Sequence, residues 1–241
     1  MSPLVHLDLS SNYFTGFLPS SMSNLDLHHI DVSYNSLTGN VMTFLPAWSN
    51  LVNFTISSTR LTGTIPNKLA DLPANLQILE STNVPVSGSI PESLMQLTSL
   101  QLLDIGFQHA EGTFPNNIGL LTNLRKFARQ GDLSRAFDWA LYSFPLKNAY
   151  VASDAGQLGI RFTPVTGTLP STIGDLTRLE KLVISFSKLK GSLPSDLGSL
   201  TKLNWVSIQG NEFTGTLPSS VSHWTNLGKL RLIEVLLKNE N

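Results

Sequence analysis

Hydrophobic positions recur along the chain with two nested periods. Two apolar residues separated by one other residue, as in Leu7 and Leu9 or Ile30 and Val32, have the period of a short strand with one buried face. Further apolar residues follow about three positions apart, and then the whole pattern begins again. Because one such unit cannot bury its apolar face alone, we expect the units to stack around one continuous core.

A Gly-x-(Leu/Ile/Phe)-Pro string marks most of the units. Its glycines are Gly16, Gly63, Gly88, Gly112, Gly167, Gly191 and Gly215, and a variant without proline lies at Gly39. When Gly39 is counted, successive glycines are 23, 24, 25, 24, 55, 24 and 24 residues apart. Glycine permits a tight corner, and proline fixes φ and removes a hydrogen-bond donor. We interpret the 55-residue interval as two repeats with an insertion.

Upstream of each glycine lies the frame L-x-x-L-x-L-x-x-N-x-L-x-G. Its central apolar residues are predicted to form one buried row that includes Leu7, Ile30, Phe54, Leu103 and Leu182. The frame's asparagine suits a side-chain amide that bonds to the backbone of a neighbouring turn. It is kept at Asn12, Asn35 and Asn211, and partly replaced by the hydroxyls of Thr59, Thr163 and Ser187.

This frame resembles the plant-type leucine-rich-repeat family over essentially the whole chain except roughly residues 125–157. The resemblance implies an α/β solenoid, a right-handed superhelix with a parallel concave β-sheet and a second short sheet near the Gly-x-Ile-Pro segments. About ten repeats of 23–25 residues are expected. Members of the family include ectodomains of receptor-like proteins and kinases, and polygalacturonase-inhibiting proteins. The implied function is non-catalytic recognition of a protein, peptide or glycan, with enzyme inhibition as the alternative.

We expect a single domain over residues 1–241, with regular repeats at 1–124 and 158–241 and one irregular repeat at 125–157. Apolar residues at helical spacing predict an amphipathic helix over 133–144. Arg129 falls where a buried aliphatic residue belongs, so the preceding strand is predicted to end early.

Two interpretations of this helix remain open. In the first, the helix replaces the convex segment of one repeat and packs its apolar face inward. In the second, it forms a partner-binding island with Arg135, Trp139 and Tyr142 on its outer face.

Recognition on such a solenoid is expected on the concave strands, where outward side chains form columns about 4.8 Å apart from strand to strand. One column is acidic in the N-terminal half, whereas neighbouring columns carry aromatic and basic residues. The predicted ligand-binding residues are Asp8, Asp31, Tyr34, Glu80, Asp104, Phe107, Phe162, Lys181, Phe186 and Trp205.

Two rival functions follow from other patterns. His6 and Asp8 lie in register with His29 and Asp31, which suggests metal binding or catalysis, but residues i and i+2 of a strand lie ~6.5–7 Å apart, too far for a His–Asp hydrogen bond. We therefore predict no catalytic residue, metal or cofactor. Threonine and serine residues on both sides of the repeat glycines could form parallel hydroxyl rows, which resemble ice-binding surfaces.

Composition and charge limit which classes of partner and site the chain can have. Lys plus Arg is 16 and Asp plus Glu is 17, a formal net charge of −1, so no global charge attracts nucleic acid. The chain has no cysteine, which excludes disulfides and thiolate zinc sites. No apolar run is long enough to span a bilayer, and the first residues do not resemble a signal peptide.

The chain begins inside a repeat and lacks the cysteine pairs that cap many members of the family, so we expect a fragment of a receptor-like parent. That parent is expected to be extracellular or at the cell surface. Its expected partners are a protein or peptide ligand, with a glycan as an alternative ligand and a co-receptor as a further partner. Asn53-Phe54-Thr55 is a candidate glycosylation sequon at Asn53.

Overall fold

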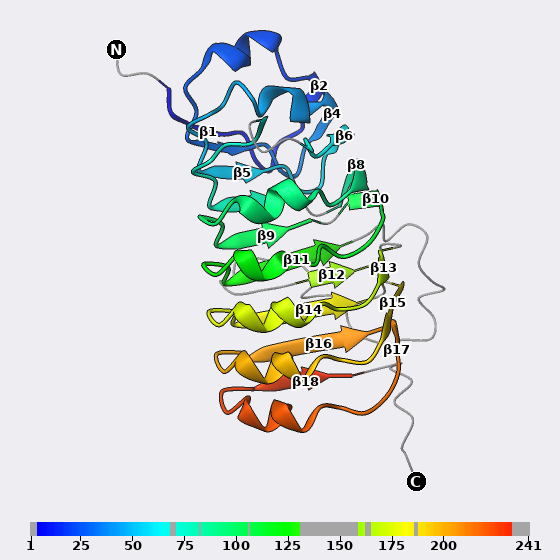
Figure 1. The fold of residues 1–241 in the computed structure, drawn as a ribbon. Coiled ribbons are helices and arrows are strands. Elements are labelled where there is room, and N and C mark those ends of the chain that lie inside the picture. Colours follow the sequence, from blue (N-terminus) through cyan, green and yellow to red (C-terminus); the bar gives the residue numbers. More distant parts are fainter. Residues whose placement is uncertain are drawn as a thin grey trace.

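The computed structural model describes residues 4–67, 71–81, 83–105, 107–130, 159–161, 165–185 and 188–232. Parallel strands stack into one long sheet, and short 3₁₀ turns stack along another side of the molecule (Figure 1). The long sheet, called here the concave sheet, contains β1 (His6–Asp8), β3 (His29–Asp31), β5 (Asn53–Thr55), β7 (Ile78–Glu80), β9 (Leu102–Asp104), β11 (Lys126–Gln130), β12 (Gly159–Arg161), β14 (Lys181–Ser185), β16 (Trp205–Gln209) and β18 (Lys229–Arg231).

The expected second sheet lies at the Gly-x-Ile-Pro segments and is divided in two. The first part contains β2 (Thr15–Phe17), β4 (Ser36–Asn40), β6 (Arg60–Thr64), β8 (Val84–Ser89) and β10 (Phe107–Glu111). The second part contains β13 (Thr166–Gly167), β15 (Lys188–Gly191) and β17 (Glu212–Phe213). A single bridge between Thr113 and Thr166 joins the two parts in the described portion of the chain.

The 3₁₀ turns form what we call the turn face. They are η1 (Ser20–Asn24), η2 (Val41–Phe44), η4 (Glu92–Gln96), η5 (Ile118–Leu120), η8 (Ser171–Asp175), η9 (Ser195–Ser199) and η10 (Ser219–His223). Within the residues that the structure describes, no helix has the length and apolar character needed to cross a membrane.

The central row of the core is the one that the sequence predicts. Strand register pairs Leu7 with Ile30 and Ile30 with Phe54. The register continues through Leu79, Leu103, Phe127, Leu182 and Val206 to Leu230, which is 43% exposed in the last strand of the sheet. Phe54, Leu103 and Leu182 are fully buried. The prediction of one continuous row is therefore confirmed, and each coil depends on its neighbours for burial of its apolar face.

The asparagine frame position also behaves as predicted. The side-chain amides of Asn12 and Asn35 donate to backbone carbonyls of their turns, and Asn211 donates to Ile184 of the previous coil. The Thr59 hydroxyl takes the same role by donating to the carbonyl of Ile56. Thr163 and Ser187 lie outside the described residues.

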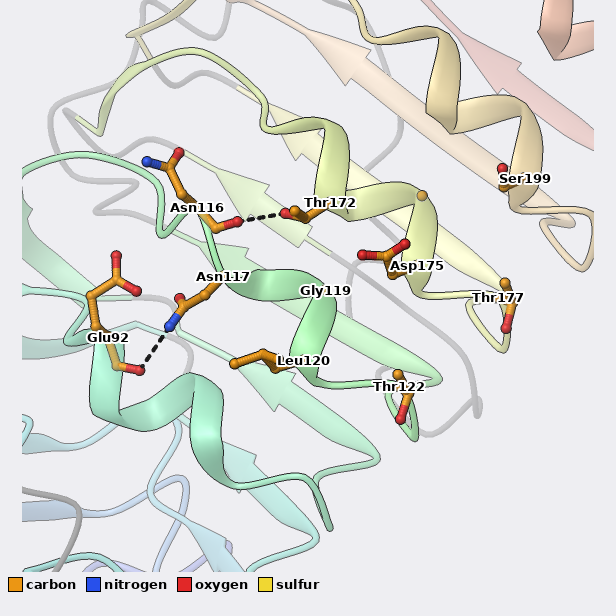
Figure 2. A pocket seen from close by; sticks show the side chains of 11 residues that line it. Glu92, Asn116, Asn117, Gly119, Leu120, Thr122, Thr172, Asp175, Thr177 and Ser199 are labelled. Carbon is orange, nitrogen blue, oxygen red and sulfur yellow. Dashed lines mark hydrogen bonds between the residues drawn. The ribbon is translucent and has the colours of Figure 1, made fainter.

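The 55-residue interval adds two strands to the concave sheet, whereas on the turn face its two ends meet directly. β11 pairs with β14 through Lys126 and Lys181, and with β12 through Arg129 and Ile160. On the turn face, the Thr172 hydroxyl of η8 donates to the carbonyl of Asn116, next to η5. The sequence predicted two repeats in this interval. The two additional strands agree with that prediction, whereas among the described turns η5 and η8 are direct neighbours (Figure 2).

The prediction that the strand ends before Arg129 is wrong. β11 runs to Gln130, because the backbones of Arg129 and Gln130 pair with Ile160 and Arg161 of β12. A partner strand thus satisfies backbone groups that a strand ending earlier would have left unpaired. The predicted helix over 133–144, and with it Arg135, Trp139 and Tyr142, lies outside the described residues.

Glycine allows successive turns to approach closely on the turn face. A Cβ atom at Gly198 of η9 would lie 2.5 Å from the Cβ and 2.6 Å from the carbonyl oxygen of Ser220 in η10. Gly174 of η8 meets the backbone of Asp196 in the same way. An added methyl group would therefore push one coil away from the next.

Gly198→Ala is expected to lower the free energy of unfolding by about 1–3 kcal/mol, the usual cost of overpacking. Urea denaturation measures this loss. Gly228→Ala is the matched control, because the nearest atom to its Cβ would be the carbonyl oxygen of Asn204 at 3.6 Å. Equal losses in the two variants would contradict the steric explanation.

Candidate ligand-binding face

The acidic column of the concave sheet lies in strict strand register. Asp8 pairs with Asp31, Asp31 with Thr55, Thr55 with Glu80, and Glu80 with Asp104. We call these five residues the acid column. Beyond it the same positions hold Ala128 in β11 and, from β12 onward, Gly159, Val183, Ser207 and Arg231. The predicted change from acidic to non-acidic residues along the sheet is thus present in the strand register.

A second column runs two positions before the acid column, on the same face of each strand. Its members are His6, His29, Asn53, Ile78, Leu102, Lys126, Lys181, Trp205 and Lys229, and we call it the flanking column. Its character changes along the sheet, from imidazoles through two aliphatic residues to lysines and an indole.

The two aliphatic members of the flanking column were not among the predicted ligand-binding residues. Ile78 and Leu102 are neighbours in the register, and both are half-buried. Each lies two residues before an acid of the acid column, Glu80 or Asp104, so the period of two could have placed them on the concave face. As aliphatic residues they carry neither the charge nor the aromatic ring by which the other concave positions stand out in the sequence.

Trp205 is held between two lysines at the C-terminal end of the flanking column. The Lys229 ammonium lies 4.6 Å from the centroid of the Trp205 ring, and the Lys181 ammonium lies 5.5 Å from it. Both distances suit cation–π attraction, which fixes the charged groups beside the ring. The predicted residues Lys181 and Trp205 are therefore brought together, with Lys229 as a third member.

Two of the predicted acids also have a role in their own turns. The backbone amide of Ser10 donates to Asp8 Oδ1 at 2.8 Å, and that of Ser33 donates to Asp31 Oδ1 at 2.9 Å. Hydrogen bonds from the Ser10 side chain, and then from its backbone amide, hold the pKa of Asp8 below its usual value. These carboxylates shape the turn that follows each strand and still present oxygen atoms at the sheet surface.

The predicted aromatic column is only partly described. Tyr34 follows β3, is 43% exposed and has a left-handed backbone with φ of 54°. Phe107 follows β9 as Tyr34 follows β3, and it also begins β10 of the second sheet, where it pairs with Val84. Phe162 and Phe186 lie outside the described residues.

The N-terminal histidines stack on each other. The ring centroids of His6 and His29 lie 5.2 Å apart, with 30° between the ring planes. Among the described residues, no group of three or more histidine or acidic side chains is placed to hold a metal ion.

Asn53, the candidate glycosylation site, lies in β5 on the concave sheet and pairs with His29 and Ile78. Phe54, the middle residue of the sequon, is fully buried, as the core frame predicts. A glycan at Asn53 would therefore stand among the flanking-column residues of the N-terminal half.

Hydroxyl-bearing residues line the second sheets but not in unbroken rows. Thr62, Thr64, Thr166, Thr168, Thr214 and Thr216 are all exposed beside their glycines. Exposed Lys190 interrupts the row before the glycines, and Phe17 and Asn40 interrupt the row after them. A regular lattice of hydroxyl and methyl groups would need those positions, so the ice-binding alternative stays a prediction without further support.

Comparisons with known proteins agree with this geometry. A family model described as Leucine Rich Repeat matches residues 3–25. Receptor-like protein 6 of Arabidopsis thaliana is 30% identical over 190 residues, which cover 74% of this chain and 18% of that protein. The chain spans less than one fifth of the curated relatives it matches, at 12%, 16% and 18% in three of them.

Two solved structures extend the likeness to nearly the whole chain. The plant peptide hormone receptor RGFR1 in complex with RGF2 has a TM-score of 0.75 at 26% identity, covering 98% of this chain and 32% of that one. The ectodomain of the receptor kinase GASSHO1/SCHENGEN3 from Arabidopsis thaliana, in complex with CASPARIAN STRIP INTEGRITY FACTOR 2, has a TM-score of 0.77 at 26% identity, covering 98% and 24%. With the repeat frame and the stacked parallel strands, these likenesses identify the chain as a plant-type leucine-rich-repeat protein.

Proposed function

We propose that the chain is a non-catalytic recognition module that binds an extended peptide along its concave sheet. The observation that carries the proposal is the strand register of the acid column from β1 to β9, and of the flanking column along β1 to β11 and on through β14, β16 and β18. Strands about 4.8 Å apart make this surface roughly 40 Å long, which an extended peptide of about twelve residues would cross. Regular columns of side chains offer such a ligand repeated contacts.

The distribution of charge favours one direction for the peptide. Asp31, Glu80 and Asp104 would attract a basic segment or the amino terminus. Lys181 and Lys229, on both sides of Trp205, would attract an acidic segment or the terminal carboxylate. Opposite charges at the two ends of a binding surface fix the register of a ligand more than they add to its affinity.

The half-buried Ile78 and Leu102 lie in the flanking column between Asn53 and Lys126, on the same strands as Glu80 and Asp104. They offer an apolar contact to the middle of the peptide, where a bulky side chain would lose the most water-exposed area.

The likeness to RGFR1, a plant peptide hormone receptor in complex with RGF2, supports a peptide as the ligand class. Extracellular or cell-surface placement and a co-receptor as an additional partner belong to the same proposal. Both are proposals for the whole protein, because this chain spans only 12%, 16% and 18% of three of its relatives.

Selection from a display library of random peptides about twelve residues long tests this function. We expect enriched peptides to carry basic residues towards one end and acidic residues towards the other. For an enriched peptide, Glu80→Lys and Trp205→Ala should each weaken binding by about ten- to hundredfold, the range expected for central contacts. Isothermal titration calorimetry gives the dissociation constants.

Lys188→Ala, on an exposed position of β15 in the second sheet, is the matched control and should leave binding unchanged. Peptides that bind Glu80→Lys, Trp205→Ala and Lys188→Ala with the same affinity as the parent chain would place the ligand elsewhere and contradict the proposal.

A further inference from the structure

One sequence motif, the sequon Asn53-Phe54-Thr55, coincides with one strand of the concave sheet. It is the only Asn-x-Ser/Thr sequence in the chain. It makes up β5, the middle one of the five strands that carry the acid column (Figure 1). An N-linked oligosaccharide on this chain would therefore stand at the centre of the acid column.

The strand directs the two polar residues of the sequon to the concave surface. Phe54 is fully buried in the core row, and side chains alternate between the two faces of a strand. Asn53 and Thr55 consequently share the outer face, and both are half-buried. A sugar attached to Asn53 would project from the sheet and leave the core row undisturbed.

The Asn53 side-chain amide is not needed by the fold. The structure gives it no hydrogen bond among the described residues. Other asparagine amides do join neighbouring coils, since that of Asn123 donates to the carbonyl of Thr98 and that of Asn226 to the carbonyl of Thr201. A sugar on Asn53 Nδ2 would therefore replace no inter-coil bond.

The sugar has to be attached before β5 joins the sheet. In the folded chain the backbone of Asn53–Thr55 is paired with β3 on one side and β7 on the other, so a transferase cannot bend it. On the unfolded chain, Asn53 Nδ2 forms a bond to the anomeric carbon of a lipid-linked oligosaccharide. The bond from that carbon to the lipid pyrophosphate breaks, the pyrophosphate leaves, and the amide loses one proton.

We propose that Asn53 carries an N-linked oligosaccharide that covers the acid column and leaves the C-terminal end of the concave sheet, around Trp205, open. The proposal rests on the extracellular placement and the peptide site proposed above. With strands about 4.8 Å apart, the acid column extends roughly 10 Å to either side of β5. Trp205 lies five register steps from Asn53, or roughly 24 Å. The first sugar rings are held within the shorter distance by their bond to Nδ2.

Secretion of the full chain from cultured plant cells, behind a cleavable signal sequence, tests the modification without any peptide ligand. We expect mass spectrometry of proteolytic fragments to find an oligosaccharide on Asn53. Thr55→Ala should abolish it, and Thr55→Ser, which keeps the sequon, should retain it. A secreted chain with unmodified Asn53, or a modification that survives Thr55→Ala, would overturn the proposal.

Labelling of carboxylates with a water-soluble carbodiimide and an amine tests the coverage, by comparing the modified chain with Asn53→Gln from the same cells. Asp31 and Glu80, on the strands next to β5, should react several-fold more slowly in the modified chain. Glu212, exposed on β17 of the second sheet, is the internal control and should react at the same rate in both. Equal rates at Asp31 and Glu80 in the two chains would overturn the proposal.

A peptide enriched on the unmodified chain separates this proposal from the peptide site itself. It should bind the modified chain at least about tenfold more weakly than it binds Asn53→Gln, because its basic segment loses the acid column. Equal binding to the two forms would overturn the coverage and leave the peptide site standing. If no peptide is enriched, the proposed function fails, and the mass and labelling results still decide whether Asn53 carries a covering oligosaccharide.

Discussion

Trp48→Ala is expected to lower the free energy of unfolding by about 3–5 kcal/mol, the range for removal of a large buried ring. The Trp48 side chain is 1% exposed, and its ring stacks on Phe44 with centroids 5.0 Å apart. Its indole N–H donates to the carbonyl of Met22 in the preceding coil at 3.0 Å. Alanine would leave a cavity between two coils and remove the inter-coil bond, so that the Met22 carbonyl keeps only the backbone amide of Leu25 as a donor. Urea denaturation measures the loss.

Trp48→Leu separates packing from the hydrogen bond. Leu97, Leu121, Leu176 and Leu200 hold the matching position in other coils and are all buried. Leucine should therefore recover part of the loss but not the inter-coil bond to the carbonyl of Met22. A loss below about 1 kcal/mol in Trp48→Ala would contradict a central packing role for the ring.

Trp224 occupies the same place in the last described coil, and its indole N–H donates to the carbonyl of Leu197 at 2.8 Å. This inter-coil bond was absent from the sequence-based expectations. The sequence shows only that tryptophan replaces leucine at one apolar position, and the carbonyl that accepts the bond lies 26 or 27 residues away. Such a contact depends on how closely two coils approach, which a repeat frame does not specify.

The side-chain columns of the concave sheet could be predicted, because the repeat frame does specify which residues are neighbours there. A period of two within each strand and a repeat of 23–25 residues together determine which side chains lie next to one another. Asp31 therefore had to lie between Asp8 and Thr55, and Lys181 next to Trp205, as the register confirms. The same reasoning does not indicate that β10 of the second sheet begins at Phe107, because nothing in the spacing marks the start of that strand.

The contact between η5 and η8 on the turn face had no signature in the sequence. The segment from Pro115 to Leu124 keeps the ordinary frame of apolar residues. In the structure η5 is shorter than η4 and η8, and η8 lies directly beside it. The 55-residue interval between Gly112 and Gly167 marks this region in the sequence as irregular. Its length alone does not say which turns lie next to one another.

Asn35→Ala is expected to lower the free energy of unfolding by about 2–4 kcal/mol, because a buried amide that bonds two coils is lost. Asn35 is 8% exposed, and its Nδ2 lies 2.8 Å from the carbonyl oxygen of Leu9 in the preceding coil. Its Oδ1 accepts from the backbone amide of Phe14 at 3.0 Å. Alanine would leave the Phe14 amide without this acceptor and would remove the inter-coil bond to the Leu9 carbonyl, which keeps only the Asn12 amide as a donor.

Asn12→Ala is the matched control, because Asn12 holds the same frame position on an exposed turn. Its Nδ2 donates only within its own turn, to the carbonyls of Leu9 and Ser10. Water can replace those bonds, so we expect a loss of about 0.5 kcal/mol. Hydrogen exchange adds a local readout, since the Phe14 amide should exchange faster in Asn35→Ala and not in Asn12→Ala. Similar losses in the two variants would mean that the asparagine shapes its own turn but does not join the coils.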